Sequence, residues 1–283
     1  MSEQQPPHFF TIRHIDETKN VISSRISVQP KIGLILGSGL GDLADSVQEP
    51  LIIPYPELPY WPAPTVIGHQ GALVIGTLAG QPVIVMRGRV HFYEGYSMQQ
   101  VTFPVRVMQR LGIEMLMVTN AAGAVNQTFS PGDVMLIIDH LNLIGMAGNN
   151  PLRGPNLDEF GPRFPDMSQV YDRQLATLVR SSALSSGIKL QEGVYACLAG
   201  PSFETSADLR FLKTAGVDAV GMSTVPEVTV ARHGGLRVLG LSGISNKANL
   251  DGETVTTHEE VLEAGKLITP KMAAIIKGVL RQL

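Results

Sequence analysis

Short, continuous apolar runs alternate with segments of helical pattern from Lys31 to the end of the chain, and this alternation is the feature that most constrains the fold. Because the runs are apolar throughout, they are typical of strands buried on both faces of a sheet. We predict a single α/β domain over residues 31–283, with a central twisted sheet, mixed or parallel, flanked by helices. Residues 1–30 are expected to pack on this domain as an N-terminal segment. The predicted strands are residues 31–36 (KIGLIL), 82–88 (PVIVMRG), 115–122 (MLMVTNAA), 133–139 (DVMLIID), 193–200 (GVYACLAG), 218–223 (DAVGMS) and 237–244 (RVLGLSGI).

Helix boundary signals mark two segments. Thr224 and Glu227 have the spacing of a capping box, and residues 256–266 (TTHEEVLEAGK) repeat it, which places His258 in the first turn of a long C-terminal helix. Pro270 predicts that this helix is kinked or split in two. A further helix is indicated by an apolar face made of Leu175, Leu178, Val179 and Ala183.

Composition excludes several classes of protein. Hydrophobic residues make up 44% of the 283, which is enough for a sizeable core and argues against global disorder. The net charge of −3 and the lack of a long basic run argue against nucleic acid as a partner. The single cysteine, Cys197, cannot form an intrachain disulfide. No signal-peptide core or membrane-spanning apolar run is present, so we expect a soluble, cytoplasmic protein without a membrane partner.

Residues 33–43, GLILGSGLGDL, form a glycine-rich loop after the first predicted strand. Glycines around Ser38 allow backbone N–H groups to close on an anion, either the pyrophosphate of a dinucleotide or a free phosphate. A dinucleotide site needs G-x-G-x-x-G and an acidic residue about 20 residues further on. Here the glycines have a different spacing, residues 52–61 (IIPYPELPYW) are proline-rich and do not indicate a strand, and Glu57 is a poor candidate. A simple tight turn explains the loop as well as a ligand site does.

Polar and small residues follow several of the other predicted strands. Arg89 and His91 lie two apart, so both can point to one side of an extended chain, and the planar fork of an arginine suits phosphate. A surface arginine beside a structural histidine is the alternative. Phe203 beside Glu204 suits a planar heterocycle with N–H donors, although a core phenylalanine and a solvated glutamate explain the pair equally.

Three more strand ends show the same ambiguity. Residues 119–123 (TNAAG) either pack closely or present backbone N–H groups to a ligand. Ser223, at a helix start, either caps the helix or binds an anion there. Asn246 either forms a turn or uses its amide both to donate to and to accept from a ligand.

Taken together and in order, these segments resemble the trimeric purine nucleoside phosphorylases from about Lys31 to the C-terminal helix. The matching segments are GSGLG, GRVHFYEGY, TNAAG, DHLNL, NPLRGPN, GPSFET, DAVGMSTVPE and SNK. The resemblance implies a nucleoside phosphorylase type of fold. It also implies reversible phosphorolysis of 6-oxopurine (deoxy)ribonucleosides, such as inosine and guanosine, to free base and pentose 1-phosphate in purine salvage. Orthophosphate is then a co-substrate, and neither a cofactor nor a metal is expected.

The resemblance also implies roles for particular residues. The phosphate would be surrounded by Ser38, His69 on a mobile loop, Arg89, His91, Ser223 and the backbone at Ala121. The purine would contact Phe203, Glu204, Met222 and Asn246, and the ribose would contact Tyr93, Met222, His258 at the 5′-hydroxyl and Phe164 from a neighbouring subunit. Asn246, Glu204 and His91 are the residues expected to serve catalysis, Asn246 by a hydrogen bond to purine N7. The shared site implies a homotrimer.

Three alternative functions fit the sequence less well. Methylthioadenosine phosphorylases typically have an aspartate in place of Asn246 and a small residue in place of His258, so both positions argue against that relative. A nicotinamide-dependent dehydrogenase fails on the glycine spacing. A non-catalytic nucleoside-binding protein would not need the whole phosphate cluster. The sequence departs from the family at Gln70, often alanine there, and in the variable segment 249–257.

Overall fold

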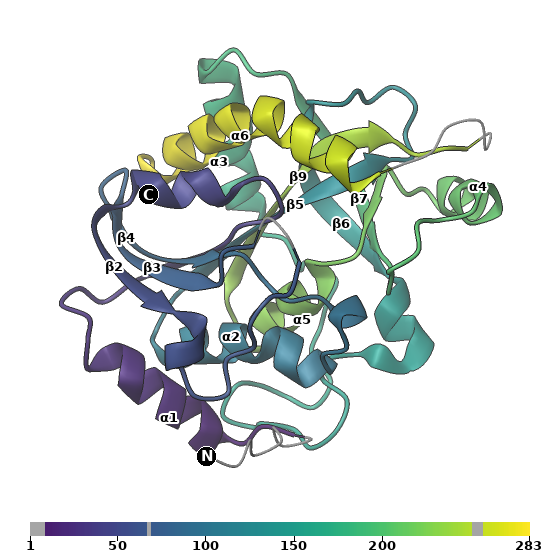
Figure 1. Cartoon of the computed structure of the whole chain (residues 1–283). Coiled ribbons are helices and arrows are strands. Elements are labelled where there is room, and N and C mark those ends of the chain that lie inside the picture. The colour runs from purple at the N-terminus through teal and green to yellow at the C-terminus, as the bar shows by residue number, and fades with distance from the viewer. Residues whose placement is uncertain (1–8, 67–68, 251–256) are drawn as a thin grey trace.

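The computed structural model describes residues 9–66, 69–250 and 257–283, and one mixed sheet runs through the described part of the chain (Figure 1). Its strand order is β2-β3-β4-β1-β5-β8-β7-β6-β9, and β9 pairs with β5 as well, so the last five strands close into a ring. The strands are β1 (Ile32–Ile35), β2 (Gln48–Pro54), β3 (Ala72–Leu78), β4 (Gln81–Arg87), β5 (Met115–Ala124), β6 (Val134–Asn142), β7 (Leu190–Cys197), β8 (Ala219–Gly221) and β9 (Arg237–Lys247).

The sheet combines parallel and antiparallel pairs, with β8 antiparallel to β5 and β7 parallel to both β8 and β6. β1 lies parallel to both β4 and β5, and β5 lies parallel to β9. β2 and β3 are antiparallel additions beside β4, and β6 runs antiparallel to β9. All seven predicted strands are therefore confirmed, and the prediction of a mixed sheet in an α/β fold is correct.

The prediction that residues 52–61 contain no strand is wrong at their first residues. Residues 52–54 are the end of β2, and β3 was not predicted at all. β2 pairs only with β3, so it is an edge strand with one side free of partners. Proline lacks a backbone N–H and is tolerated there, which is why a proline-rich segment can be a strand.

The described residues form six α-helices, and five of them cover the two faces of the sheet. The six are α1 (Ile12–Ser23), α2 (Met98–Arg110), α3 (Arg173–Ser185), α4 (Ser206–Thr214), α5 (Val225–His233) and α6 (His258–Leu280). Figure 1 shows α3 and α6 on one side of the sheet and α1, α2 and α5 on the other. Short helical turns complete the described elements: η1 (Gly41–Ser46), η2 (Tyr55–Glu57), η3 (Phe92–Glu94) and η4 (Gly145–Asn149).

Two large apolar clusters hold these layers together. Consecutive residues of β1 belong to different clusters, since Leu34 packs with α3 and α6 whereas Ile35 packs with α1, α2 and α5. The predicted apolar face of α3 is confirmed, because Leu175 and Val179 are fully buried in the cluster that contains Leu34. Ile15 of α1 is buried in the cluster that contains Ile35, so the N-terminal helix is part of the core.

The C-terminal helix begins as predicted but does not divide. Thr257 accepts a hydrogen bond from the backbone N–H of Glu260, as expected for the capping box. Of the kink or split predicted at Pro270, the split is wrong, because α6 is one element across the proline. Buried side chains on both sides of the proline, including Ile268 and Met272, anchor the helix to the sheet and offset the one backbone hydrogen bond that proline cannot make.

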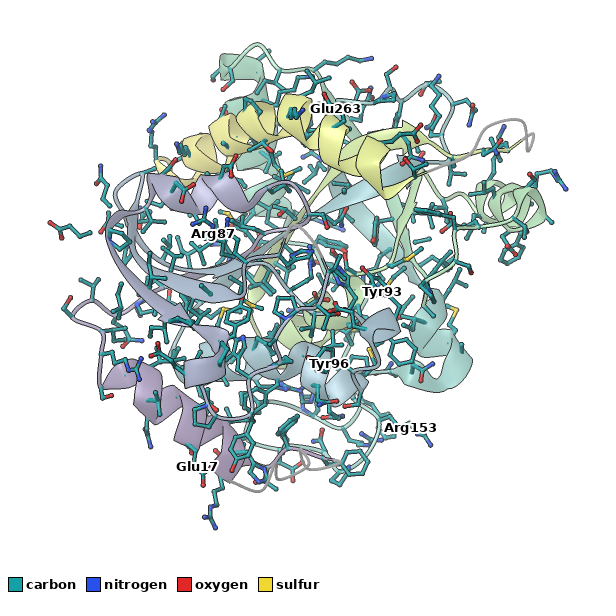
Figure 2. All side chains as sticks on the ribbon, in the orientation of Figure 1. Glu17, Arg87, Tyr93, Tyr96, Arg153 and Glu263 are labelled. Atoms are coloured by element: carbon teal, nitrogen blue, oxygen red, sulfur yellow. The ribbon has the colours of Figure 1, made fainter. Side chains whose placement is uncertain are left out.

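Charged side chains lie mainly at the periphery of the molecule. Figure 2 shows Glu17, Arg153 and Glu263 near its edge, whereas Tyr93 lies further in. Among the helices of the described residues, none combines the length and hydropathy of a membrane span.

Candidate active site

A cavity of about 350 Å³ opens where several strands end and their loops begin. It is bounded by the ends of β5 and β9 and by the segments that follow β1, β4 and β8, as expected for a ligand site in an α/β fold. Ten of the thirteen predicted site residues line it: Ser38, Arg89, His91, Tyr93, Ala121, Phe203, Glu204, Met222, Ser223 and Asn246. The tertiary fold thus brings together segments that are up to about 200 residues apart in the sequence.

The remaining three predicted residues are placed differently. His69 does not line the cavity, but its Nε2 lies 3.1 Å from Ser38 Oγ. Phe164 lies outside the cavity of this chain, with 88% of its side chain exposed. His258 is the first residue of α6, and its side chain is outside the described part of the structure.

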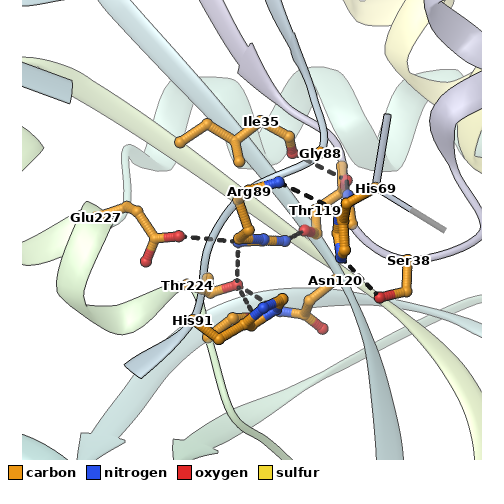
Figure 3. Close-up of polar contacts among 12 residues, drawn as sticks. Ile35, Ser38, His69, Gly88, Arg89, His91, Thr119, Asn120, Thr224 and Glu227 are labelled. Carbon is orange, nitrogen blue, oxygen red and sulfur yellow. Dashed lines mark hydrogen bonds and ion pairs between the residues drawn. The ribbon is translucent and has the colours of Figure 1, made fainter. Parts of the chain in front are cut away.

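Arg89 forms the charged floor of the cavity, and its side chain is only 3% exposed. As Figure 3 shows, Nη1 donates to Thr224 Oγ1 (3.2 Å) and to the Glu227 carboxylate (3.1 Å), and Nη2 donates to the Thr119 carbonyl. The Nε atom is buried and has no hydrogen-bond partner among the described residues. A guanidinium carries five N–H donors, so two remain for an acceptor such as a phosphate oxygen.

A tight turn at Thr224 connects the cavity to α5. Thr224 has φ 76° and ψ −53°, and the Val225 N–H donates to the Ser223 carbonyl at 2.9 Å, which together define a γ-turn with a positive central φ. A β-branched residue is strained in this conformation, at a cost of about 1–3 kcal/mol. Strain of this kind is commonly found where a backbone must hold a functional group in place.

The predicted capping box of Thr224 and Glu227 is wrong. Thr224 makes no side-chain cap, and its Oγ1 instead accepts from Arg89 and from Asn120 Nδ2 (2.9 Å). Glu227 turns to the same guanidinium. The physical reason is a difference in free energy. Leaving the buried Arg89 cation without acceptors costs more than leaving the N–H groups at the start of α5 without a side-chain cap. Glu227, Asn120 and Thr119 were not predicted as site residues, although each lies within one of the matching motif segments, TNAAG or DAVGMSTVPE.

His69 connects the glycine loop to the end of β4. The Arg89 backbone N–H donates to His69 Nδ1 at 3.1 Å, so a neutral ring carries its proton on Nε2 and can donate it to Ser38 Oγ. The Ser38 hydroxyl then keeps its own proton for a ligand. Gly88 permits this approach, because it has φ 101° and a Cβ there would lie 2.7 Å from His69 Cβ.

His91 is oriented by a carboxylate that the sequence analysis missed. His91 Nδ1 lies 2.9 Å from Glu94 Oε1, and the ring stacks on Tyr93 with centroids 4.8 Å apart. Burial raises the pKa of Glu94, but hydrogen bonds from His91 and Thr65 outweigh it and hold the pKa at about 2. The ionised carboxylate thus binds Nδ1–H and leaves Nε2 as the other polar atom of the ring. The three-residue spacing from His91 was the available signal.

An amide, a carboxylate and an aromatic ring also line the cavity. Asn246 Oδ1 accepts from Ser245 Oγ at 2.8 Å, and Nδ2 donates to the Lys247 carbonyl at 3.3 Å, which fixes the orientation of the amide. Burial raises the pKa of Glu204, and Phe203 is 48% exposed. These three groups suit a flat ring that presents both donors and acceptors.

The polar residues that line the cavity fall into two groups. Arg89, Ser38, His91 and Ser223 offer donors to an anion, and Glu204 and Asn246 offer directional polar groups. Within the described residues, no cluster of three His, Cys, Asp or Glu side chains could hold a metal ion.

Comparisons with known proteins identify the family. The family model described as Phosphorylase superfamily matches residues 31–281. Purine nucleoside phosphorylase 1 of Bacillus subtilis is 52% identical over 268 residues, which cover 95% of this chain and 98% of that protein. Purine nucleoside phosphorylase of Bos taurus is 49% identical over 271 residues, which cover 94% of each. The crystal structure of the Schistosoma mansoni purine nucleoside phosphorylase in complex with adenosine is 42% identical, with a TM-score of 0.93 over 96% of this chain and 98% of that one.

The chain belongs to the phosphorylase superfamily and, within it, to the purine nucleoside phosphorylase family. The resemblance seen in the sequence motifs and the predicted type of fold are both confirmed.

The depressed pKa of Glu94 predicts how the free energy of unfolding depends on pH. The pKa is about 2 in the folded protein against an ordinary 4.5, so ionised Glu94 stabilises the fold above pH 4.5, and this contribution is lost as the pH falls towards 2. We expect Glu94→Gln to lower the free energy of unfolding at pH 7 by at most about 3 kcal/mol. The difference between the two proteins should be much smaller at pH 3. Chemical denaturation at both pH values measures it.

Glu263→Gln, at an exposed position of α6, is the control and should behave like the unaltered protein at both pH values. A Glu94→Gln deficit of the same size at pH 7 and pH 3 would contradict the assignment of these hydrogen bonds to an ionised Glu94.

Proposed function

We propose that this protein catalyses the reversible phosphorolysis of purine nucleosides, preferring 6-oxopurine (deoxy)ribonucleosides such as inosine and guanosine. The family to which it belongs consists of pentosyltransferases named for this reaction. One observation carries the proposal. A single cavity is lined both by a buried arginine with unused N–H donors and by a carboxylate and an amide. Phosphate bound at the arginine is then the nucleophile, and the purine is bound by the carboxylate and the amide.

The proposed mechanism rests on charge separation. As the glycosidic bond breaks, positive charge develops on the sugar and negative charge on the base. A bound phosphate stabilises the positive charge on the sugar. It would be held by Ser38, Arg89, His91, Ser223 and the Ala121 backbone, with His69 closing over it. Asn246, hydrogen-bonded to N7, stabilises the negative charge on the base. Removing one such preorganised donor commonly slows an enzyme by about 10²–10³-fold.

Recognition of the base is assigned to Glu204, which would accept from N1–H, with Phe203 and Met222 packing on the ring. Tyr93 and Met222 would contact the ribose, and His258 its 5′-hydroxyl. Orthophosphate is a co-substrate, and no cofactor or metal takes part. We place the activity in the cytoplasm, in purine salvage.

We further propose a homotrimer with shared sites. Phe164 is an apolar side chain with 88% exposure, and its loop is held by a hydrogen bond between His233 Nε2 and the Pro162 carbonyl. Contact with a neighbouring subunit would bury it over that subunit's ribose position.

Phosphate dependence tests the proposed reaction. Release of hypoxanthine from inosine should require orthophosphate and should yield ribose 1-phosphate in equal amount. Ser38→Ala should raise the KM for phosphate, because a donor to the anion is lost. Base release is followed spectrophotometrically with and without phosphate. Equal turnover in phosphate-free buffer would mean that the cavity supports hydrolysis.

Base preference tests the roles of Glu204 and Asn246. Adenosine presents a bare N1 lone pair to Glu204 and a 6-amino donor to the amide, which leaves groups unpaired. Sites of this kind can discriminate by about 10⁴–10⁵-fold, so adenosine should be a very poor substrate. Asn246→Asp should narrow the gap in kcat/KM, since a carboxylate accepts from the 6-amino group.

The adenosine complex of the Schistosoma mansoni relative shows that a related site can hold that nucleoside, so the comparison must be made on turnover. If the unaltered protein cleaves adenosine as efficiently as inosine, the two assigned roles are wrong.

The role of Phe164 is tested by size and by kinetics. Light scattering should report about three chains per particle, and Phe164→Ala should raise the KM for inosine while leaving the KM for phosphate unchanged. Leu184→Ala removes a side chain of similar exposure (83%) from α3 and should change neither constant. A monomer with full activity would refute the shared site.

A further inference from the structure

Glu227 lies behind the cavity and does not line it. Its carboxylate binds Arg89 Nη1 at 3.1 Å, and both side chains are only 3% exposed. A buried ion pair of this kind is costly to desolvate, and removing one partner leaves an uncompensated charge. The pair therefore needs an explanation beyond stability.

The contact determines which part of the Arg89 guanidinium remains available. Nη1 is occupied by Glu227 and Thr224, and Nη2 gives one N–H to the Thr119 carbonyl. What remains is Nε–H, which is buried without a partner among the described residues, and one N–H of Nη2. Partners from β5, from the centre of the γ-turn and from α5 thus prevent rotation of the fork (Figure 3).

The helix that carries Glu227 is itself fixed at both ends. Eight of the nine residues of α5 are buried. At its C-terminal end, His233 Nδ1 lies 2.8 Å from Arg106 Nη2, and Nε2 lies 3.0 Å from the Pro162 carbonyl. At its N-terminal end, the strained turn at Thr224 sets the direction of the first turn. Glu227 is thereby presented to Arg89 from a rigid element.

We propose that Glu227 is a positioning residue that sets the affinity of the cavity for phosphate, an inference that rests on the proposed phosphorolysis. It acts in two ways. It holds the guanidinium so that the Nε side is left for the anion, and it compensates the charge of Arg89. The anion is therefore held by directed N–H donors more than by net positive charge. Thr224 takes part through the hydroxyl that Arg89 and Asn120 share.

The test compares Glu227→Leu with Glu227→Gln. Leucine removes the acceptor, so Arg89 can rotate. Glutamine keeps an oxygen at the Oε1 position, and its amide group replaces Oε2, which has no hydrogen-bond partner among the described residues. We expect Glu227→Leu to raise the KM for phosphate at least tenfold with the KM for inosine changed less than threefold. Glu227→Gln should recover most of that loss. Calorimetric titration with inorganic phosphate should show the same order.

Two further variants keep the inference testable if Glu227→Leu does not fold. Thr224→Val should weaken phosphate binding selectively, and Thr224→Ser, which keeps the hydroxyl, should not. Asp172→Leu is the control, because Asp172 binds Arg237 and caps α3 away from the cavity. It should reduce thermal stability without changing the ratio of the KM for phosphate to the KM for inosine.

Failure of the inference differs from failure of the proposed function. Loss of the proposed function would appear in the unaltered protein as base release that does not require phosphate. The positioning role is overturned if the unaltered protein depends on phosphate while the Leu and Val variants keep its phosphate KM, or if they raise both KM values equally.

Discussion

The burial of one guanidinium organises the functional half of this molecule. Arg89 follows β4 and is surrounded by protein, so its charge must be met by acceptors that the chain itself supplies. Those acceptors come from the middle of β5 and from the start of α5. The same contacts that satisfy the cation therefore fix the segment after β4, strand β5 and helix α5 against one another. They also leave part of its hydrogen-bonding capacity for a ligand.

Strain and rigidity appear together around this cation. The γ-turn at Thr224 places a β-branched residue in an unfavourable backbone conformation, yet its hydroxyl accepts hydrogen bonds from Arg89 and Asn120. Helix α5 begins after the turn and is almost fully buried. Burial of its apolar residues, for example Val228, offsets the free-energy cost of the strained backbone at Thr224. At the C-terminal end of α5, His233 binds the loop that contains Phe164.

A second carboxylate repeats this logic on a smaller scale. Glu94 is kept ionised by donors from His91 and Thr65, and in return it orients the imidazole. Three polar groups of the candidate site, those of Arg89, His91 and Asn246, are thus each held by a neighbouring side chain. Preorganisation of this kind is what an enzyme needs where charge develops during the reaction.

The sequence by itself determined the class of fold and the neighbourhood of the site. Apolar runs such as residues 115–122 can be satisfied only inside a sheet covered on both faces, and local motifs placed Arg89 and Asn246 at strand ends. Only the tertiary structure decided the partners. Glu227 has the spacing of a helix cap, and nothing local distinguishes that role from pairing with a cation 138 positions away. Edge strand β2 likewise depends on β3 beside it, because strand formation at a proline-rich edge is decided by pairing and not by propensity.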